Sequence, residues 1–182
     1  MELGFKTLVI FTIFQRVFEL FISKRNENYI LSQGGKVLPE KNYFFMVVLH
    51  STWLMLLAYF ALKGALEFHL QSFVIFTMLF LLGQFFRLSA ILTLGKRWST
   101  RVMILPNAPV IKSGLFKIFR HPNYIGVILE IASLPLIAGL WKMAILYSIL
   151  NGAILIIRIR FEEKMLVKHN DYKEQFLQER FS

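Results

Sequence analysis

The chain has 182 residues, of which 56% are hydrophobic and none is cysteine, and its formal net charge is +10. This length fits one domain, 1–182, and the missing cysteines exclude disulfides and thiolate chemistry. The four histidines are scattered and form no cluster with carboxylates at ligand spacing, so we expect no metal site.

Most apolar residues fall into blocks of the length that a helix needs to cross a bilayer, about 20 residues. These blocks predict an all-α, polytopic integral membrane protein with about five transmembrane helices, at 4–22, 42–62, 69–92, 123–140 and 142–159. Three of them make up the amino-terminal part, 1–92. The remaining part, 93–182, holds a long connection, a helical hairpin and a tail.

Basic residues gather on one side of this predicted topology. The first and third connections and the tail carry most of the 21 lysine and arginine residues, and the other face carries only Lys6, Lys63 and Lys142. By the positive-inside rule, the carboxy-terminus lies in the cytoplasm, and we expect the plasma (inner) membrane. Anionic lipid headgroups then account for the positive charge, so no nucleic-acid partner is expected.

Two polar segments lie on that cytoplasmic side. The connection 93–121 is too polar to span the membrane, and a loop of this length usually has a function. Beyond residue 158, apolar residues recur among charges, which predicts an amphipathic helix or helix pair at the interface. Its apolar members are Phe161, Met165, Val167, Tyr172, Phe176 and Leu177.

The stretch FRHPNYIG, 119–126, lies where the fourth predicted crossing begins. Pro122 suits the first helical position, because the N–H that it lacks would have no partner there. Free N–H groups, the helix dipole and Arg120 together favour an anion at this helix start. His121 and Tyr124 are three apart and share a face. Spacing alone leaves ordinary interfacial anchoring open as the role of Arg120 and His121.

Acidic residues follow on the last two crossings. Glu130 lies about 12 Å along the helix from Pro122, and an acid inside the membrane indicates either a functional role or a polar contact between helices. The stretch RIRFEE, 158–163, places Arg158, Glu162 and Glu163 at the exit of the last helix. These are either ordinary ion pairs along a helix or carboxylates that bind a ribose diol, an ammonium or a sulfonium.

Three polar residues lie inside the first two predicted crossings: Arg16, Glu19 and His50. Together with Glu130, they are candidates for substrate binding. Two simpler interpretations remain open. Arg16 and Glu19 are three apart and could neutralise each other, and His50 could form an interhelical hydrogen bond.

The segments SGLFKIFRHPNYIG (113–126) and RIRFEEKML (158–166), with Tyr172, resemble the isoprenylcysteine carboxyl methyltransferase family of integral membrane methyltransferases. The resemblance covers roughly the last half of the chain. It implies an S-adenosylmethionine-dependent O-methyltransferase whose cofactor is enclosed by the long connection, the fourth helix and the tail. It also implies that His121 and Tyr124 hold the cofactor, that Glu163 lies at it and that Arg158 lies near the reacting centre. Arg120 and Glu162 are then expected to bind the same cofactor.

The first half of the chain is similar to a bacterial subfamily linked to O-methylation of alkylpyrones. The similarity rests on RVFELFISKRN (16–26), Gly34-Gly35 and HSTW (50–53). The expected acceptor is a carboxylate or acidic hydroxyl of a lipophilic molecule, isoprenylcysteine-like or alkylpyrone-like. A membrane sterol-type reductase with a nicotinamide cofactor and a non-enzymatic membrane subunit or small transporter are the alternatives. The oligomeric state is left open.

Overall fold

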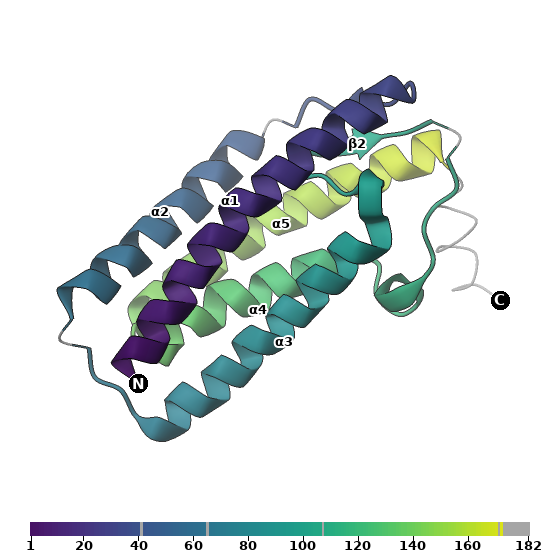
Figure 1. Cartoon of the computed structure of the whole chain (residues 1–182). Coiled ribbons are helices and arrows are strands. Elements are labelled where there is room, and N and C mark those ends of the chain that lie inside the picture. The colour runs from purple at the N-terminus through teal and green to yellow at the C-terminus, as the bar shows by residue number, and fades with distance from the viewer. Residues whose placement is uncertain (41, 65, 107, 171, 173–182) are drawn as a thin grey trace.

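The structure is a computed structural model that describes the chain except residues 41, 65, 107, 171 and 173–182. Its described residues form five α-helices: α1 (Glu2–Ser32), α2 (Tyr43–Lys63), α3 (Leu70–Leu94), α4 (Pro122–Ile137) and α5 (Trp141–His169). Figure 1 shows them side by side in one elongated bundle. Two strands of two residues each, β1 (Lys36–Val37) and β2 (Met103–Ile104), and two 3-10 turns, at Gly95–Arg97 and Gly114–Lys117, complete the all-α fold.

Three helices are long and apolar enough to cross a membrane: α2, α3 with its 3-10 extension and α5. The chain is therefore an integral membrane protein. Helix α4 is apolar but has 16 residues, about 24 Å, which is shorter than a hydrocarbon core of about 30 Å. Helix α1 has 31 residues and carries charges within its apolar stretch. Membrane crossing by α1 and α4 stays a prediction.

Helix α1 is ten residues longer at its carboxy-terminal end than the predicted crossing 4–22, so the prediction of a connection from residue 23 is wrong. Its last turns are polar, but Ser23, Asn26 and Glu27 are buried. The Asn26 amide donates hydrogen bonds to the carbonyl oxygens of Gly95 at 3.0 Å and Trp98 at 2.8 Å. Contact with the long connection therefore stabilises a helical segment that has no apolar face of its own.

Helix α5 continues to His169 without a break, past the predicted end of the crossing at 159. Phe161, Met165 and Val167 lie on this extension, whereas Phe176 and Leu177 fall outside the described residues. The separate amphipathic tail helix therefore stays a prediction. The predicted hairpin before α5 is confirmed: α4 ends at Ile137 and Gly139 turns the chain with a φ of +68°.

Helices α3 and α4 pack closely through two glycines. A Cβ atom at Gly126 would lie 2.5 Å from Cγ of Arg87 and 2.6 Å from the carbonyl oxygen of Gly83. The missing side chain at Gly126 therefore lets α3 approach α4 and brings Arg87 against it. The core beside this contact consists of buried side chains of all five helices, including Phe5, Trp53, Leu57, Phe80, Ile131, Leu134 and Tyr147.

The two short strands join the connections at one end of the bundle. Strands β1 and β2 are antiparallel, with Lys36 opposite Ile104 and Val37 opposite Met103. Figure 1 shows that this end also holds the start of α4 and the last turns of α1 and α5. Segments that carry most of the basic residues therefore meet in space.

Candidate functional site

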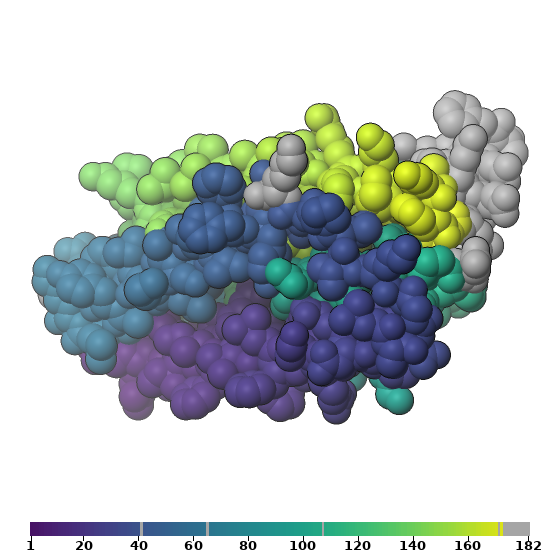
Figure 2. Space-filling view, turned by 90° about the horizontal axis from the view of Figure 1, so that it is seen from above, coloured from purple at the N-terminus to yellow at the C-terminus, as the bar shows by residue number. Residues whose placement is uncertain are grey.

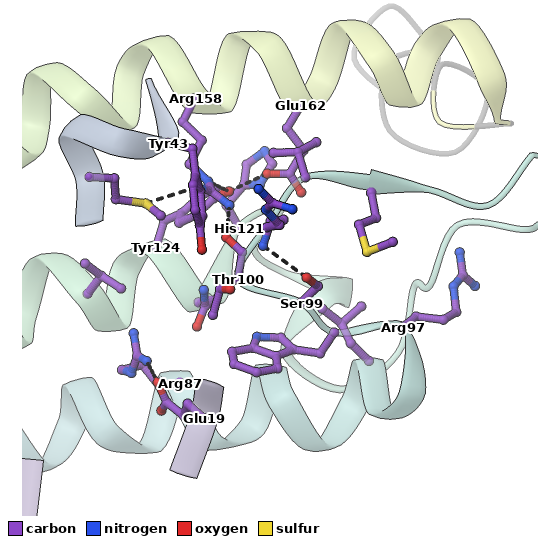
Figure 3. A pocket seen from close by; sticks show the side chains of 18 of the residues that line it. Glu19, Tyr43, Arg87, Arg97, Ser99, Thr100, His121, Tyr124, Arg158 and Glu162 are labelled. Carbon is purple, nitrogen blue, oxygen red and sulfur yellow. Dashed lines mark hydrogen bonds and ion pairs between the residues drawn. The ribbon is translucent and has the colours of Figure 1, made fainter. Parts of the chain in front are cut away.

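A cavity of about 490 Å³ lies among these segments. All five helices and β2 contribute lining residues, and the long connection supplies Ser99, Thr100 and Arg101. Figure 3 shows the labelled polar side chains converging from α1, α3, α4, α5 and the long connection. Residues that are far apart in the sequence thus share one enclosed space.

Glu163 is the centre of the first polar cluster. Its Oε1 lies 3.1 Å from Nε2 of His121 and 3.4 Å from Nη1 of Arg120, and it accepts a hydrogen bond from the Tyr172 hydroxyl at 3.0 Å. Burial and the neighbouring Glu163 carboxylate raise the pKa of the Tyr172 phenol, so it stays protonated and donates. The start of α4 and the end of α5 are held together by this one carboxylate.

Tyr124 is the centre of the second cluster. Its hydroxyl donates a short hydrogen bond to Oε2 of Glu162 and accepts one from Nε of Arg158 at 2.8 Å. The rings of His121 and Tyr124 stack, with centroids 5.4 Å apart and planes 25° apart. Tyr124 therefore connects Arg158 to Glu162.

Arg158 is almost completely buried and makes further contacts outside α5. Its Nη1 lies 3.0 Å from Oε1 of Glu40, and its Nη2 donates to the carbonyl oxygen of Thr100 at 2.7 Å. Burial raises the pKa of the Glu40 carboxyl, although the positive charge of Arg158 acts in the opposite direction. The guanidinium joins three segments: the α1–α2 connection, the long connection and α4.

A third group of charges lies deeper in the bundle, on α1, α3 and α4. Arg16 contacts Glu19 at 3.2 Å and Glu130 at 2.8 Å. Arg87 forms an ion pair with the same oxygen of Glu19 and lies 3.4 Å from Glu130. These four residues form a closed ring of alternating charge, which we call the charge ring. Two of its members, Arg16 and Glu19, are the pair whose mutual neutralisation the sequence left open.

His50 of α2 also lines the cavity. Its Nδ1 lies 2.8 Å from the carbonyl oxygen of Met46, one helical turn away. Because a carbonyl oxygen only accepts, Nδ1 carries the proton and Nε2 is an acceptor. That Nε2 is buried and has no hydrogen-bond partner among the described residues.

The residues at the cavity fit a zwitterionic nucleoside group such as S-adenosylmethionine. Five lining side chains have buried polar atoms without a hydrogen-bond partner in the described part of the chain: His50 Nε2, Arg87 Nε, Trp98 Nε1, Asn123 Oδ1 and Asn170 Oδ1. Such atoms are destabilising unless something supplies a hydrogen bond. These donors and acceptors, with the Glu162 carboxylate in the lining and Glu163 beside it, could hold an adenosine and an amino-acid moiety.

The predicted site residues fall into two groups in the structure. The predicted cofactor residues Arg120, His121, Tyr124, Glu162 and Glu163 lie together, and the predicted substrate residues Arg16, Glu19, Glu130 and His50 lie deeper. Of the predicted site residues, Glu130 and Glu163 are absent from the cavity lining. Sequence reasoning missed Glu40 and Thr100, which carry no signal beyond a turn-rich or polar segment. Arg87 was not among the predicted site residues either, although a charged residue inside the apolar block 69–92 was an available signal.

Comparisons with known proteins match this part of the chain. Residues 73–168 match the sequence profile of the isoprenylcysteine carboxyl methyltransferase (ICMT) family. The chain is 30% identical over 169 residues to an uncharacterized protein of Bacillus subtilis, YpbQ, with 91% of this chain and 98% of that protein covered. It is 28% identical over 153 residues to an uncharacterized protein of Haemophilus influenzae, with 83% and 88% covered. No solved structure matches.

A membrane-embedded helical bundle with a cavity at one end, together with the match of residues 73–168, defines a membrane methyltransferase class of protein. The chain belongs to the isoprenylcysteine carboxyl methyltransferase family. The family that the sequence motifs resemble is thereby confirmed. Enzymes of this family use S-adenosylmethionine as methyl donor.

Proposed function

We propose that this protein transfers a methyl group from S-adenosylmethionine to a carboxylate or acidic hydroxyl oxygen of a lipophilic acceptor in the membrane. The observation that carries the proposal is the pair of carboxylates Glu162 and Glu163. They are held by Tyr124 and His121 beside a cavity of about 490 Å³. Both carboxylates and both partners lie in the segment that matches the family.

The cofactor would be bound by the two clusters at the ends of α4 and α5. Glu163, which His121, Arg120 and Tyr172 orient, offers a carboxylate to an ammonium, a sulfonium or a ribose diol. Glu162 offers a second one. The positive end of the α4 dipole and the guanidinium of Arg120 suit a carboxylate of the amino-acid moiety.

When bound, S-adenosylmethionine supplies a methyl group on a positively charged sulfonium. The chain itself would contribute a dry, preorganised enclosure. Opposite charges disappear as a methyl group passes from a sulfonium to an oxyanion, so a poorly solvated pocket lowers the barrier relative to water. A carboxylate or acidic enol is already anionic near neutral pH, and no strong base is needed. Arg158, through its bond to Tyr124, would keep the Glu162 side chain aligned with the reacting centre.

The membrane context supports a lipophilic acceptor. Basic segments gather at the end of the bundle that holds the cavity, and on the positive-inside rule we place that end in the cytoplasm, at the plasma (inner) membrane. Within the class, the motifs RVFELFISKRN and HSTW favour an alkylpyrone-like acceptor over an isoprenylcysteine-like one.

Calorimetric binding of S-adenosylhomocysteine to the detergent-purified protein tests the proposal. We expect micromolar binding to the wild type and its loss in His121→Ala and Glu163→Ala. Lys142→Ala, at the far end of α5, is the control that keeps binding. Thermal stabilisation by a nicotinamide cofactor in place of S-adenosylhomocysteine would instead support a reductase, and no response to either would support a non-enzymatic membrane subunit.

A further inference from the structure

One member of the charge ring is more exposed than the other three. Glu19, Arg87 and Glu130 have side-chain exposures of 5%, 2% and 0%, as expected of charges that neutralise each other inside a protein. The Arg16 side chain is 20% exposed and lines the cavity. Glu19 and Arg87 also line the cavity, but Arg16 is the ring member with the most accessible side chain, and the two carboxylates of the ring hold its guanidinium in place.

Arg158, the other arginine expected to orient an acceptor, is less suited to that contact. Its three nitrogens are already used by Tyr124, Glu40 and the Thr100 carbonyl, and the residue is 4% exposed. An acceptor could bind there only by breaking one of these bonds. Arg16 needs no such exchange, because the surface that it shows to the cavity is accessible.

Apolar side chains extend from Arg16 along α1 and α2. On α1 the cavity is lined by Ile13, Arg16, Val17, Glu19 and Leu20, with Ile30 farther along, and on α2 by Tyr43, Met46, Val47, His50, Ser51 and Leu54. Both sets have the three- and four-residue spacing of one helix face. Figure 2 shows α1 in purple beside α2 in blue on one face of the molecule. Two stripes, mostly apolar, thus line the same cavity from neighbouring helices.

Some residues of these stripes are also exposed on the outside of the bundle. Val17, Leu20 and Val47 are 47%, 56% and 42% exposed although they line the cavity. A residue that belongs both to the cavity lining and to the outer surface of the bundle marks an opening of the cavity. If α1 crosses the membrane as the sequence predicts, the surroundings of such an opening at the depth of Arg16 are lipid tails.

Building on the proposed methyltransferase function, we propose that the acceptor is a single-tailed amphiphile. Its acidic oxygen binds Arg16, and its apolar tail lies between α1 and α2 toward the lipid. Glu19, Arg87 and Glu130 are positioning residues, since they hold the Arg16 fork without touching the acceptor. His50 lies on the α2 stripe and can accept a hydrogen bond through Nε2 from a hydroxylated head.

Photolabelling tests where the tail lies. The probe is palmitic acid carrying a diazirine in its chain, added to the detergent-purified full-length protein with S-adenosylhomocysteine present, and the labelled peptides are identified by mass spectrometry. We expect labels on the α1 stripe and the α2 stripe. Labels confined to other helices would overturn the proposal.

A matched pair of variants makes the test specific. Val47 and Val48 are adjacent on α2 and each is 42% exposed, but only Val47 lines the cavity. Val47→Trp should reduce labelling about tenfold, the effect expected from overfilling a packed space, and Val48→Trp should not. Equal effects of the two variants would contradict the inference.

The role of Arg16 is tested by a variant that leaves the ring neutral. Arg16→Gln combined with Glu19→Gln removes one charge of each sign, so Arg87 and Glu130 still balance. We expect labelling to fall about tenfold while the affinity for S-adenosylhomocysteine stays within about twofold. Unchanged labelling would overturn the role of Arg16. A wild type that binds no S-adenosylhomocysteine overturns the methyltransferase function, whereas one that binds it but is labelled elsewhere overturns only the acceptor site.

Discussion

Arg158 on α5 and Glu40 in the α1–α2 connection form an ion pair of 3.0 Å across 118 residues of sequence. The pair ties the amino-terminal half of the chain to the two helices that carry the cofactor motifs. The same guanidinium holds Tyr124, so the position of the α1–α2 connection and the geometry of the candidate cofactor site depend on each other.

Removing Glu40 should destabilise the fold. Glu40→Ala leaves the buried Arg158 without its carboxylate, which costs about 3–5 kcal/mol in buried pairs, whereas Glu40→Gln keeps an acceptor and should lose less. Thermal unfolding in detergent measures both, with the exposed Glu67→Ala as control. A Glu40→Ala protein as stable as the wild type would show that the pair does not hold the connection.

Replacing Arg158 should separate turnover from cofactor binding. Arg158→Ala is expected to abolish methyl transfer, whereas the affinity for S-adenosylhomocysteine should fall only a few-fold, because Arg120, His121 and Tyr172 hold Glu163 without it. Because burial already raises the pKa of Glu40, that carboxyl can take up a proton when its partner is gone, and the protein should still fold, best at mildly acidic pH. Calorimetry and a radiolabel transfer assay measure the two effects. An equal loss of both, or of folding, would refute a catalytic role.

The charge ring should behave as one unit. In a double-mutant cycle, Arg16→Gln and Glu130→Gln remove the two ends of a 2.8 Å ion pair, and the double variant should be less destabilised than the sum of the single variants by about 1–3 kcal/mol. The exposed pair of Lys6 and Glu2, 2.7 Å apart, is the control and should show a much smaller coupling because water screens it. Additive effects at Arg16 and Glu130 would mean that the ring is not closed.

Gly126→Ala should disturb the contact of α3 with α4. The new methyl group would lie 2.5 Å from Cγ of Arg87, so the helices must separate, at about 1–3 kcal/mol. Gly152→Ala on α5 is the matched control, since nothing lies within 4 Å of its added Cβ. The two unfolding midpoints measure the difference, and equal midpoints would contradict the close packing.

Tyr172→Phe should weaken cofactor binding without unfolding the protein. The hydroxyl donates to Glu163 at 3.0 Å, and a lost hydrogen bond of about 1 kcal/mol corresponds to an affinity about fivefold lower. Calorimetry with S-adenosylhomocysteine measures this, with the exposed Tyr59→Phe as control. Unchanged affinity would show that Tyr172 does not orient Glu163 for binding.

Several elements followed from local signals in the sequence. The apolar blocks predicted α2, α3 and α5 to within a few residues at their starts, because length and apolarity are properties of the segment itself. Pro122 predicted the first residue of α4, and the adjoining blocks 123–140 and 142–159 predicted the hairpin into α5, where Gly139 makes the turn. The family resemblance also rested on contiguous motifs, and the comparison confirmed it.

Other features had no local signal. The polar end of α1 is helical because Asn26 reaches backbone carbonyls of the long connection, about 70 residues away. Glu40 looked like part of a turn, and its role depends on an arginine of α5. Pairing of Arg158 with Glu162 along one helix was one of two interpretations left open, and in the structure Arg158 contacts Glu40 and reaches Glu162 through Tyr124.

The sequence by itself therefore determined which segments are long and apolar enough to cross a membrane and where α4 begins, since these properties depend on composition and spacing within one helix. Only the tertiary structure decided which charges pair and which side chains line the cavity. Those properties arise from the approach of α3 to α4 at Gly126 and from the packing of the other helices around it, and no short stretch of sequence encodes the distance between two helices.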